Sequence, residues 1–370
     1  MEEILSDTNV EYYESLPSPE DIINMIPVSE KAKQIVIEGR ETIRAILEGR
    51  DNRVLMILGP CSIHDIDAGL EYAKKLSILA NEVKDKVYVV MRSYLEKPRS
   101  TVGWKGLIYD PDLNDSLDLE KGIIIGRKFL LAVNELGLPC ANEFLRTELP
   151  QYTADLTSWA AIGARTVESQ THRELASGLS MPIGMKNNTS GEISSAVDAC
   201  ISASYPHTFL GLTMDGKNCK VRTKGNKNTH VVLRGGKNGP NYFSDKVAET
   251  LMLLKKAGLP ERVVIDCSHA NCGKIAEKQE EVAYNILQQI KSGNTTIKGI
   301  MIESNLYLGN QPFPKSLDQI TNLKYGVSIT DPCLDFESTE RIVRKYLSEL
   351  SLFLNSSLFF LFYEDRWFRR

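Results

Sequence analysis

The sequence predicts an α/β protein folded as a (β/α)8 TIM barrel, with an N-terminal extension and an inserted β-hairpin. Two observations lead to this prediction. Eight short runs rich in β-branched residues recur after residue 53, and amphipathic helix patterns lie between several of them. Runs that are apolar on both faces are typical of buried parallel strands. Eight repeats favour a closed barrel over a doubly wound sheet, which commonly has about five or six strands.

The composition describes a globular chain with a small acidic excess. Its 370 residues are 42% hydrophobic and 25% charged, so a packed core is expected and disorder throughout is excluded. The formal net charge of −4 argues against a generic nucleic-acid or membrane binder. Seven scattered cysteines are typical of reduced thiols, and the chain opens without an apolar signal core. We therefore expect a cytoplasmic protein.

Residues 1–52 precede the first barrel run and are expected to form a regulatory or oligomerisation extension. Within it, segments 18–26 and 28–49 have helical apolar spacing. The first opens with a Ser–Pro start signal, and the second ends at Gly49. The barrel is expected over residues 53–350, without a linker that would mark a second domain.

Within the barrel, strand and helix patterns alternate in the manner of repeated βα units. The strands are expected at 53–61, 86–94, 138–145, 159–167, 181–187, 230–236, 262–269 and 297–305. The clearest helices are expected at 67–83, 120–137, 244–258 and 280–293.

Three segments depart from this rhythm. The connection 93–116 is long and rich in turn formers, which is typical of functional loops. Segment 207–226 has Asp215–Gly216 between alternating runs, which predicts a β-hairpin insertion. The tail 351–370 is unusually apolar but too short to span a bilayer. It is expected either to pack as a last helix on the barrel or a subunit face, or to reflect a sequence error, and no function is assigned to it.

Each predicted strand carries a charged or reactive side chain at or near its end, at the edge where TIM barrels carry their active sites. In chain order these side chains are Cys61, Arg92, Glu143, Arg165, Lys186, Arg234, His269 and Glu303, with Asp331 in a ninth element. Small or uncharged residues would be expected at half or more of these positions. The pattern therefore predicts a functional mouth.

The basic members of this set indicate an anionic ligand. Arginine binds phosphate or carboxylate through two parallel hydrogen bonds, and lysine adds a compact charge. Four such cations at one mouth would repel each other, which implies a small, multiply charged substrate. The alternative is that they are separate surface cations paired with acids on helices. The four are Arg92, Arg165, Lys186 and Arg234.

The remaining members offer a thiol, an imidazole and two carboxylates. This mixture suits Mn, Fe, Co or Zn better than Mg or Ca, which prefer oxygen ligands. Without the barrel, each residue would more simply be structural, because a buried cysteine is usually inert packing. The four are Cys61, His269, Glu303 and Asp331.

Six motifs are similar to those of class I 3-deoxy-D-arabino-heptulosonate-7-phosphate (DAHP) synthases, over about residues 15 to 345. They are GPCSIHD (59–65), EKPRSTVGWKGLIYDPDLNDS (96–116), GARTVESQTHRELASGLSMPIGMKN (163–187), LRGGK (233–237), DCSHANC (266–272) and YGVSITDPC (325–333). The resemblance implies a TIM barrel that condenses phosphoenolpyruvate with erythrose 4-phosphate, the first committed step of the shikimate pathway.

The resemblance also implies roles for individual residues. The implied metal ligands are Cys61, His269, Glu303 and Asp331. The implied phosphoenolpyruvate contacts are Arg92, Lys97, Glu143, Arg165, Lys186 and Arg234, with the backbone of Gly163 and Ala164. The erythrose 4-phosphate phosphate is expected at Arg99 and Ser100, where many relatives have Thr in place of Ser100.

The mechanism that this implies joins C3 of phosphoenolpyruvate to the aldehyde carbon. The metal is expected to polarise the aldehyde oxygen or to position water. The expected catalytic residues are Cys61, His269 and Lys97, with Lys97 donating a proton to the developing alkoxide. Water then adds at C2, and phosphate leaves with cleavage of its C–O bond.

Regulated relatives use the N-terminal segment and the hairpin to build an inter-subunit pocket for an aromatic amino acid. Relatives that respond to phenylalanine commonly carry Ser where Gly211 stands, so tyrosine, or else tryptophan, is the expected effector. A homodimer or homotetramer is implied. The matching positions are Asp7, Val10, Pro150, Gln151, Leu179, Ser180, Phe209, Gly211 and Val221.

Two alternatives remain open from the sequence. A 3-deoxy-D-manno-octulosonate-8-phosphate synthase shares phosphoenolpyruvate but uses a five-carbon sugar phosphate; the N-terminal extension, the hairpin and the KPRST loop argue against it. A non-catalytic amino-acid sensor would have kept the barrel and lost its chemistry. The retained ligand and anion-binding residues argue against that reading.

Overall fold

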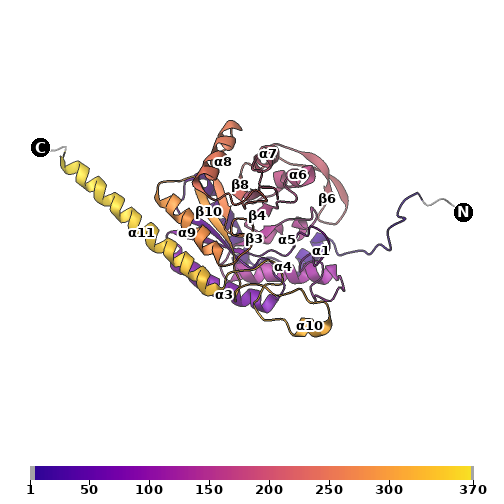
Figure 1. Ribbon diagram of the computed structural model, residues 1–370. Helices are drawn as coiled ribbons and strands as arrows, with labels where there is room; N and C mark the ends of the chain where they lie inside the picture. The colour runs from indigo at the N-terminus through magenta and orange to yellow at the C-terminus, as the bar shows by residue number, and fades with distance from the viewer. Residues whose placement is uncertain (1–4, 368–370) are drawn as a thin grey trace.

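The computed structural model describes the backbone of residues 5–367 and the side chains of residues 5–352. Eight parallel strands close a barrel in the order β1-β10-β9-β8-β5-β4-β3-β2, with helices around it (Figure 1). The predicted fold class is confirmed. The barrel strands are β1 (Val54–Gly59), β2 (Val87–Arg92), β3 (Cys140–Glu143), β4 (Trp159–Ile162), β5 (Ile183–Lys186), β8 (Thr229–Leu233), β9 (Val263–Asp266) and β10 (Ile297–Glu303).

Helices follow most of the strands, as the apolar spacing predicts. Every residue of β1, β3, β4, β5, β8 and β9 is buried, which explains their continuous apolar runs. The helices are α1 (Pro19–Met25), α2 (Glu30–Glu48), α3 (Ile66–Val83), α4 (Leu119–Glu135), α5 (Pro150–Thr153), the 3-10 turn η1 (Ala154–Leu156), α6 (Gln170–Gly178), α7 (Ser194–Ala203), α8 (Ser244–Lys256), α9 (Lys278–Lys291), α10 (Leu317–Thr321) and α11 (Phe336–Trp367).

The inserted hairpin is present outside the barrel. Strands β6 (Thr208–Leu212) and β7 (Asn218–Arg222) pair antiparallel, and the turn between them contains Gly216 at a φ of 80°. Only glycine adopts this left-handed backbone at little cost, so the Asp–Gly signal was correctly interpreted. The hairpin meets α1 and α5, because Glu20 N–H donates to the Met214 carbonyl and Gln151 donates to the Leu212 carbonyl.

The N-terminal helices begin at side-chain caps and cover the barrel. Ser18 and Asp21 form a reciprocal capping box at the start of α1, and Ser29 caps α2. Buried residues of α2, among them Ile43 and Leu47, pack in one cluster with inward-facing residues of the strands. The second half of the extension is therefore part of the barrel core.

Helix α11 contains most of the apolar tail. Its first half packs on the barrel, where Tyr346 is fully buried and its hydroxyl donates to the Ala283 carbonyl. Its second half projects beyond the body of the molecule (Figure 1). Residues 368–370 lie outside the described part of the chain. None of the helices searched within the described residues has the length and hydropathy needed to cross a membrane.

Candidate active site

The carboxyl ends of the strands surround a cavity of about 490 Å³. Most of the residues predicted for the site line it, although they are far apart in the sequence. Gly163 and Glu303 are not among its lining residues, but both contact residues that are. The predicted residues on the wall are Cys61, Arg92, Lys97, Arg99, Ser100, Glu143, Ala164, Arg165, Lys186, Arg234, His269 and Asp331.

All eight barrel strands end one to five residues earlier than the predicted runs. Cys61, Arg165, Arg234 and His269 follow the last strand residue by one to three positions, whereas Arg92, Glu143, Lys186 and Glu303 are strand ends. The predicted runs included short turns after the strands, and residue type alone does not show where strand pairing stops. One of these turns holds His269 at a φ of 56°, an unusual conformation for a side chain with a Cβ.

Two of the four predicted cations are already paired with buried carboxylates. Arg92 Nη2 lies 3.0 Å from Glu303 Oε1, and Lys186 Nζ lies 2.6 Å from Glu143 Oε2. The prediction that the four cations repel each other until a ligand binds was therefore wrong for Arg92 and Lys186. Their charges are balanced within the protein, which lets them remain buried.

The other two cations are available to a ligand. Arg165 donates from Nε and Nη2 to the Ser100 hydroxyl, and Arg234 Nη1 donates to the Gly235 carbonyl. Neither makes an ion pair with a described carboxylate. In addition, the buried Nη1 of Arg92 has no hydrogen-bond partner among the described residues. Unpaired donors at one mouth favour an anion with several oxygen atoms.

In the buried Glu143–Lys186 pair, each group stabilises the ionised form of the other. Burial is the largest single influence and would raise the pKa of Glu143, but the Lys186 ammonium, together with Arg92, lowers it overall. Burial is also the largest single influence on Lys186 and would lower its pKa, but the Glu143 carboxylate, together with Tyr94 and Asp266, raises it overall. Both groups are therefore ionised at neutral pH.

Three of the four predicted metal ligands form a compact donor group. One ligand atom from each of Cys61, Glu303 and Asp331 lies within 4.8 Å of the others. His269 lies beside this group, with Nε2 at 3.8 Å from Glu303 Oε1. A thiol, two carboxylates and a nearby imidazole match the ligand preferences of Zn, Fe, Co or Mn.

The Cys61 thiol needs a neighbouring cation in order to ionise. Burial, followed by the charge of Glu303, raises its pKa to about 11. The Lys97 ammonium lies 2.8 Å from Cys61 Sγ and 2.9 Å from Asp331 Oδ2. A cation is thus already in contact with two of the donor atoms. The donor group therefore fits a metal ion, whose higher charge would favour the thiolate further.

Sequence reasoning missed Asp266, the last residue of β9. Its carboxylate is fully buried, and Oδ1 accepts from the Ser268 backbone and hydroxyl. Oδ2 lies 3.2 Å from His269 Nε2 and 4.0 Å from Lys186 Nζ. The signal was available, because an acidic residue directly after the run VVI is unusual for a buried strand.

A second cavity, of about 270 Å³, lies between the hairpin and the α5 and α6 region. Seven of the nine residues predicted for effector binding line it. Asp7 and Val10 do not line it; both are exposed in the extended N-terminal segment. The seven are Pro150, Gln151, Leu179, Ser180, Phe209, Gly211 and Val221.

The family model for the DAHP synthetase I family matches residues 25–344. The chain belongs to this family. It is 46% identical over 347 residues to the Tyr-sensitive phospho-2-dehydro-3-deoxyheptonate aldolase of Escherichia coli strain K12, covering 94% of this chain and 96% of the relative. It is 49% identical over 339 residues to the Phe-sensitive enzyme of that strain, covering 92% and 95%. The resemblance found in the sequence motifs is confirmed.

A solved structure agrees with the fold. It is titled as the phospho-2-dehydro-3-deoxyheptonate aldolase from Francisella tularensis SCHU S4 and matches with a TM-score of 0.90 at 46% identity. The match covers 93% of this chain and 99% of that one.

Proposed function

We propose that this chain condenses phosphoenolpyruvate with erythrose 4-phosphate and water to give DAHP and inorganic phosphate. Membership of the DAHP synthetase I family supports the reaction class. The observation that carries the assignment of the site is the barrel mouth, where Arg92, Arg165 and Arg234 line one cavity beside a thiol–carboxylate donor group. A non-catalytic amino-acid sensor would need neither the arginine-lined cavity nor the thiol–carboxylate donor group.

Phosphoenolpyruvate is held by the basic wall of the cavity. Arg165, Lys186, Arg234 and the backbone of Ala164 bind its phosphate, while Arg92 and Lys97 bind its carboxylate. These contacts orient C3 toward the second substrate. Fixing two reactants in one geometry removes much of the entropic barrier of a bimolecular step.

Erythrose 4-phosphate enters beside the KPRST loop, where Arg99 and Ser100 bind its phosphate. Both residues also line an adjoining open cavity of about 750 Å³ that contains Lys237 and Lys274. The extra positive charge supports binding of a second phosphorylated substrate here.

Cys61, His269, Glu303 and Asp331 would hold a divalent Mn, Fe, Co or Zn ion, which when bound supplies Lewis-acid polarisation of a carbonyl oxygen. Lys97 donates a proton to the alkoxide oxygen that forms when C3 attacks the aldehyde. Its position, 2.8 Å from Cys61 Sγ, keeps the ammonium next to the donor group. Water then adds at C2, beside Glu143 and Lys186. It gives one proton back to Lys97 and the other to the departing phosphate as the C–O bond breaks and the C2 ketone forms.

One assay tests the reaction. Phosphate release from phosphoenolpyruvate is measured with erythrose 4-phosphate, with arabinose 5-phosphate, and after chelation. Release with erythrose 4-phosphate that stops on chelation is expected. Preference for arabinose 5-phosphate would instead indicate the octulosonate synthase, and no release with either sugar would indicate a sensor.

Feedback inhibition by an aromatic amino acid occurs at the cavity beside the hairpin. A Cβ on Gly211 would lie 2.6 Å from Val221 Cγ2, so a larger residue here would reduce the room available to a ligand. The glycine supports tyrosine, whose ring carries an additional hydroxyl, as the effector. Inhibition assays with each aromatic amino acid test this, and exclusive sensitivity to phenylalanine would contradict it.

The assembly is a homodimer or homotetramer. The N-terminal segment runs away from the body of the chain (Figure 1), and Tyr12 and Tyr13 on it are exposed. This supports an arm that reaches the effector cavity of a second subunit and brings Asp7 and Val10 to it. Sedimentation of the full chain and of a chain beginning at residue 15 would test the arm.

A further inference from the structure

Two aromatic rings from separate loops stack at the edge of the candidate active site. The rings of Trp104 and Phe313 are 6.3 Å apart between centroids and inclined by 29°. Trp104 is buried, and its indole N–H donates to the Asp110 carbonyl at 2.9 Å. The stack therefore joins the loop after β2 to the loop after β10.

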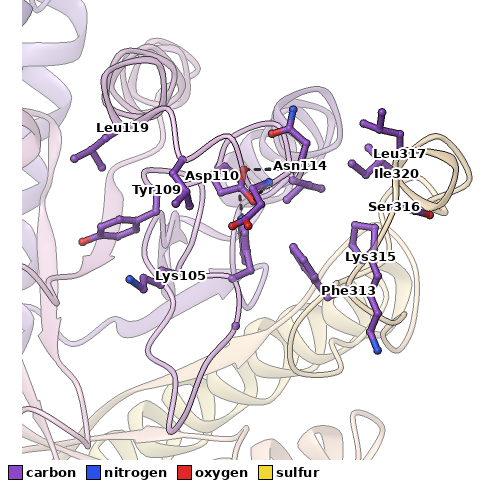
Figure 2. Close-up of a pocket in the computed structure, with 16 residues that line it drawn as sticks. Lys105, Tyr109, Asp110, Asn114, Leu119, Phe313, Lys315, Ser316, Leu317 and Ile320 are labelled. Carbon is purple, nitrogen blue, oxygen red and sulfur yellow. Dashed lines mark hydrogen bonds between the residues drawn. The ribbon is translucent and has the colours of Figure 1, made fainter. Parts of the chain in front are cut away.

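The Phe313 ring separates two cavities. It lines the candidate active site and also a second cavity of about 670 Å³, which Trp104 lines as well. Figure 2 shows this second cavity, with Phe313 and α10 residues such as Leu317 on one side and Tyr109 and Asp110 on the other. Space therefore lies on one side of the stack, while Trp104 belongs to the buried apolar core and Phe313 packs against that core.

Trp104 adjoins the predicted sugar-phosphate contact. Its neighbour Gly103 has a φ of +144°, and a Cβ there would lie 2.7 Å from Nε and 2.8 Å from Nη2 of Arg99. The guanidinium thus lies directly on the Gly103 backbone. Any movement of Trp104 moves the surface that supports Arg99.

The two loops differ in how firmly they are fixed. Gln311, near Phe313, donates from its backbone to the Ser328 carbonyl at 2.7 Å and from its side chain to the Val327 carbonyl at 3.0 Å. By contrast, the backbone groups of residues 98–104 make no hydrogen bond to any described residue. Side-chain contacts therefore hold this segment, and the stack is one of them.

We propose that Phe313 is a positioning residue for the sugar phosphate: its stack on Trp104 holds the Gly103 backbone under Arg99. The proposal rests on the proposed role of Arg99 in binding erythrose 4-phosphate. Phe313 does not touch the reacting atoms. Its effect is on affinity for erythrose 4-phosphate, because neither Gly103 nor Arg99 is among the proposed phosphoenolpyruvate contacts.

The test compares KM values for both substrates in purified full-length variants. F313A is expected to raise KM for erythrose 4-phosphate about three- to ten-fold, the equilibrium equivalent of losing one aromatic pair. KM for phosphoenolpyruvate is expected to stay within twofold. F313Y keeps the ring and should restore the wild-type value. L317A is the matched control, because Leu317 lines the same cavity but is 71% exposed and makes no aromatic stack.

R99A separates failure of this inference from failure of the site assignment. If R99A leaves KM for erythrose 4-phosphate unchanged, the assignment of Arg99 is wrong. If R99A raises that KM while F313A does not, the stack has no positioning role and the inference is overturned. F313L, which preserves apolar volume, gives the same readout should F313A fold poorly. Equal increases in both KM values would also overturn the inference, since they would indicate general damage.

Discussion

Replacing Lys186 by methionine tests whether the anion-binding wall is held by internal charge balance. Lys186 Nζ lies 2.6 Å from Glu143 Oε2, and both side chains are buried, with exposed fractions of 3% and 5%. The substitution leaves the Glu143 carboxylate buried with its nearest cation removed. Breaking a buried pair in this way costs about 3–5 kcal/mol in the free energy of unfolding. Removing both charges, in K186M/E143Q, should recover most of that loss.

The pH dependence of this loss has a defined sign. In the wild type, Lys186 and Arg92 together lower the pKa of Glu143 despite its burial. The pair therefore contributes stability above the unfolded-state pKa of about 4.3, and this contribution is lost as pH falls through the folded-state value. In K186M, burial dominates and the pKa of Glu143 rises above its unfolded value. The free energy of unfolding of K186M then lies furthest below that of the wild type near neutral pH. The difference becomes smaller as the pH falls toward about 5.

Urea unfolding at several pH values between about 5 and 8 measures both effects. K217M is the matched control, because the Lys217–Asp215 pair is on the surface of the hairpin and its removal should leave the unfolding midpoint unchanged. If the K186M and E143Q losses simply add in the double variant, the two charges are not coupled. A K186M deficit that does not depend on pH would equally refute the reasoning.

Three further predictions concern chemistry and regulation. C61A should abolish turnover by loss of the metal, seen as loss of the cobalt–thiolate absorption band on Co²⁺ titration; normal turnover without added metal would exclude Cys61 as a ligand. K97M should lower kcat by about 100-fold or more at saturating substrate, in the range expected for a lost general acid, whereas a change confined to KM would leave Lys97 only a binding role. G211S should raise the tyrosine concentration needed for half-inhibition about tenfold, equivalent to about 1.4 kcal/mol, without changing kcat. If G211S remains as sensitive to tyrosine as the wild type, the room left by Gly211 does not determine effector binding.

The fold was predictable because its signals are local. Fully buried parallel strands appear as continuous apolar runs, and Asp215–Gly216 marks a turn whose backbone only glycine adopts readily. The ends of the strands were less accurate: β9 ends at Asp266, whereas the predicted run continues to His269. Residue type could locate the mouth of the barrel but could not locate the last hydrogen bond of a strand.

The internal pairing of the site was not predictable from the sequence. Glu303 and Arg92 are separated by more than half of the chain, and their ion pair depends on the neighbouring positions of β1, β2 and β10 in the closed sheet. Asp266 was missed for a related reason, because its importance depends on contacts with His269 and Lys186. The Trp104–Phe313 stack likewise joins two loops whose sequences carry no mark of each other.

The position of α2 limits how this protein can be shortened. Ile43, Ile46 and Leu47 close the floor of the barrel, and Arg40 donates to the Ala154 and Thr157 carbonyls beneath it. A truncation at residue 53, chosen to obtain an unregulated enzyme, would open that floor to water and yield an insoluble or unfolded product. A variant that no longer responds to the effector should instead begin just before α1. This removes the N-terminal arm and keeps α2 packed against the floor of the barrel.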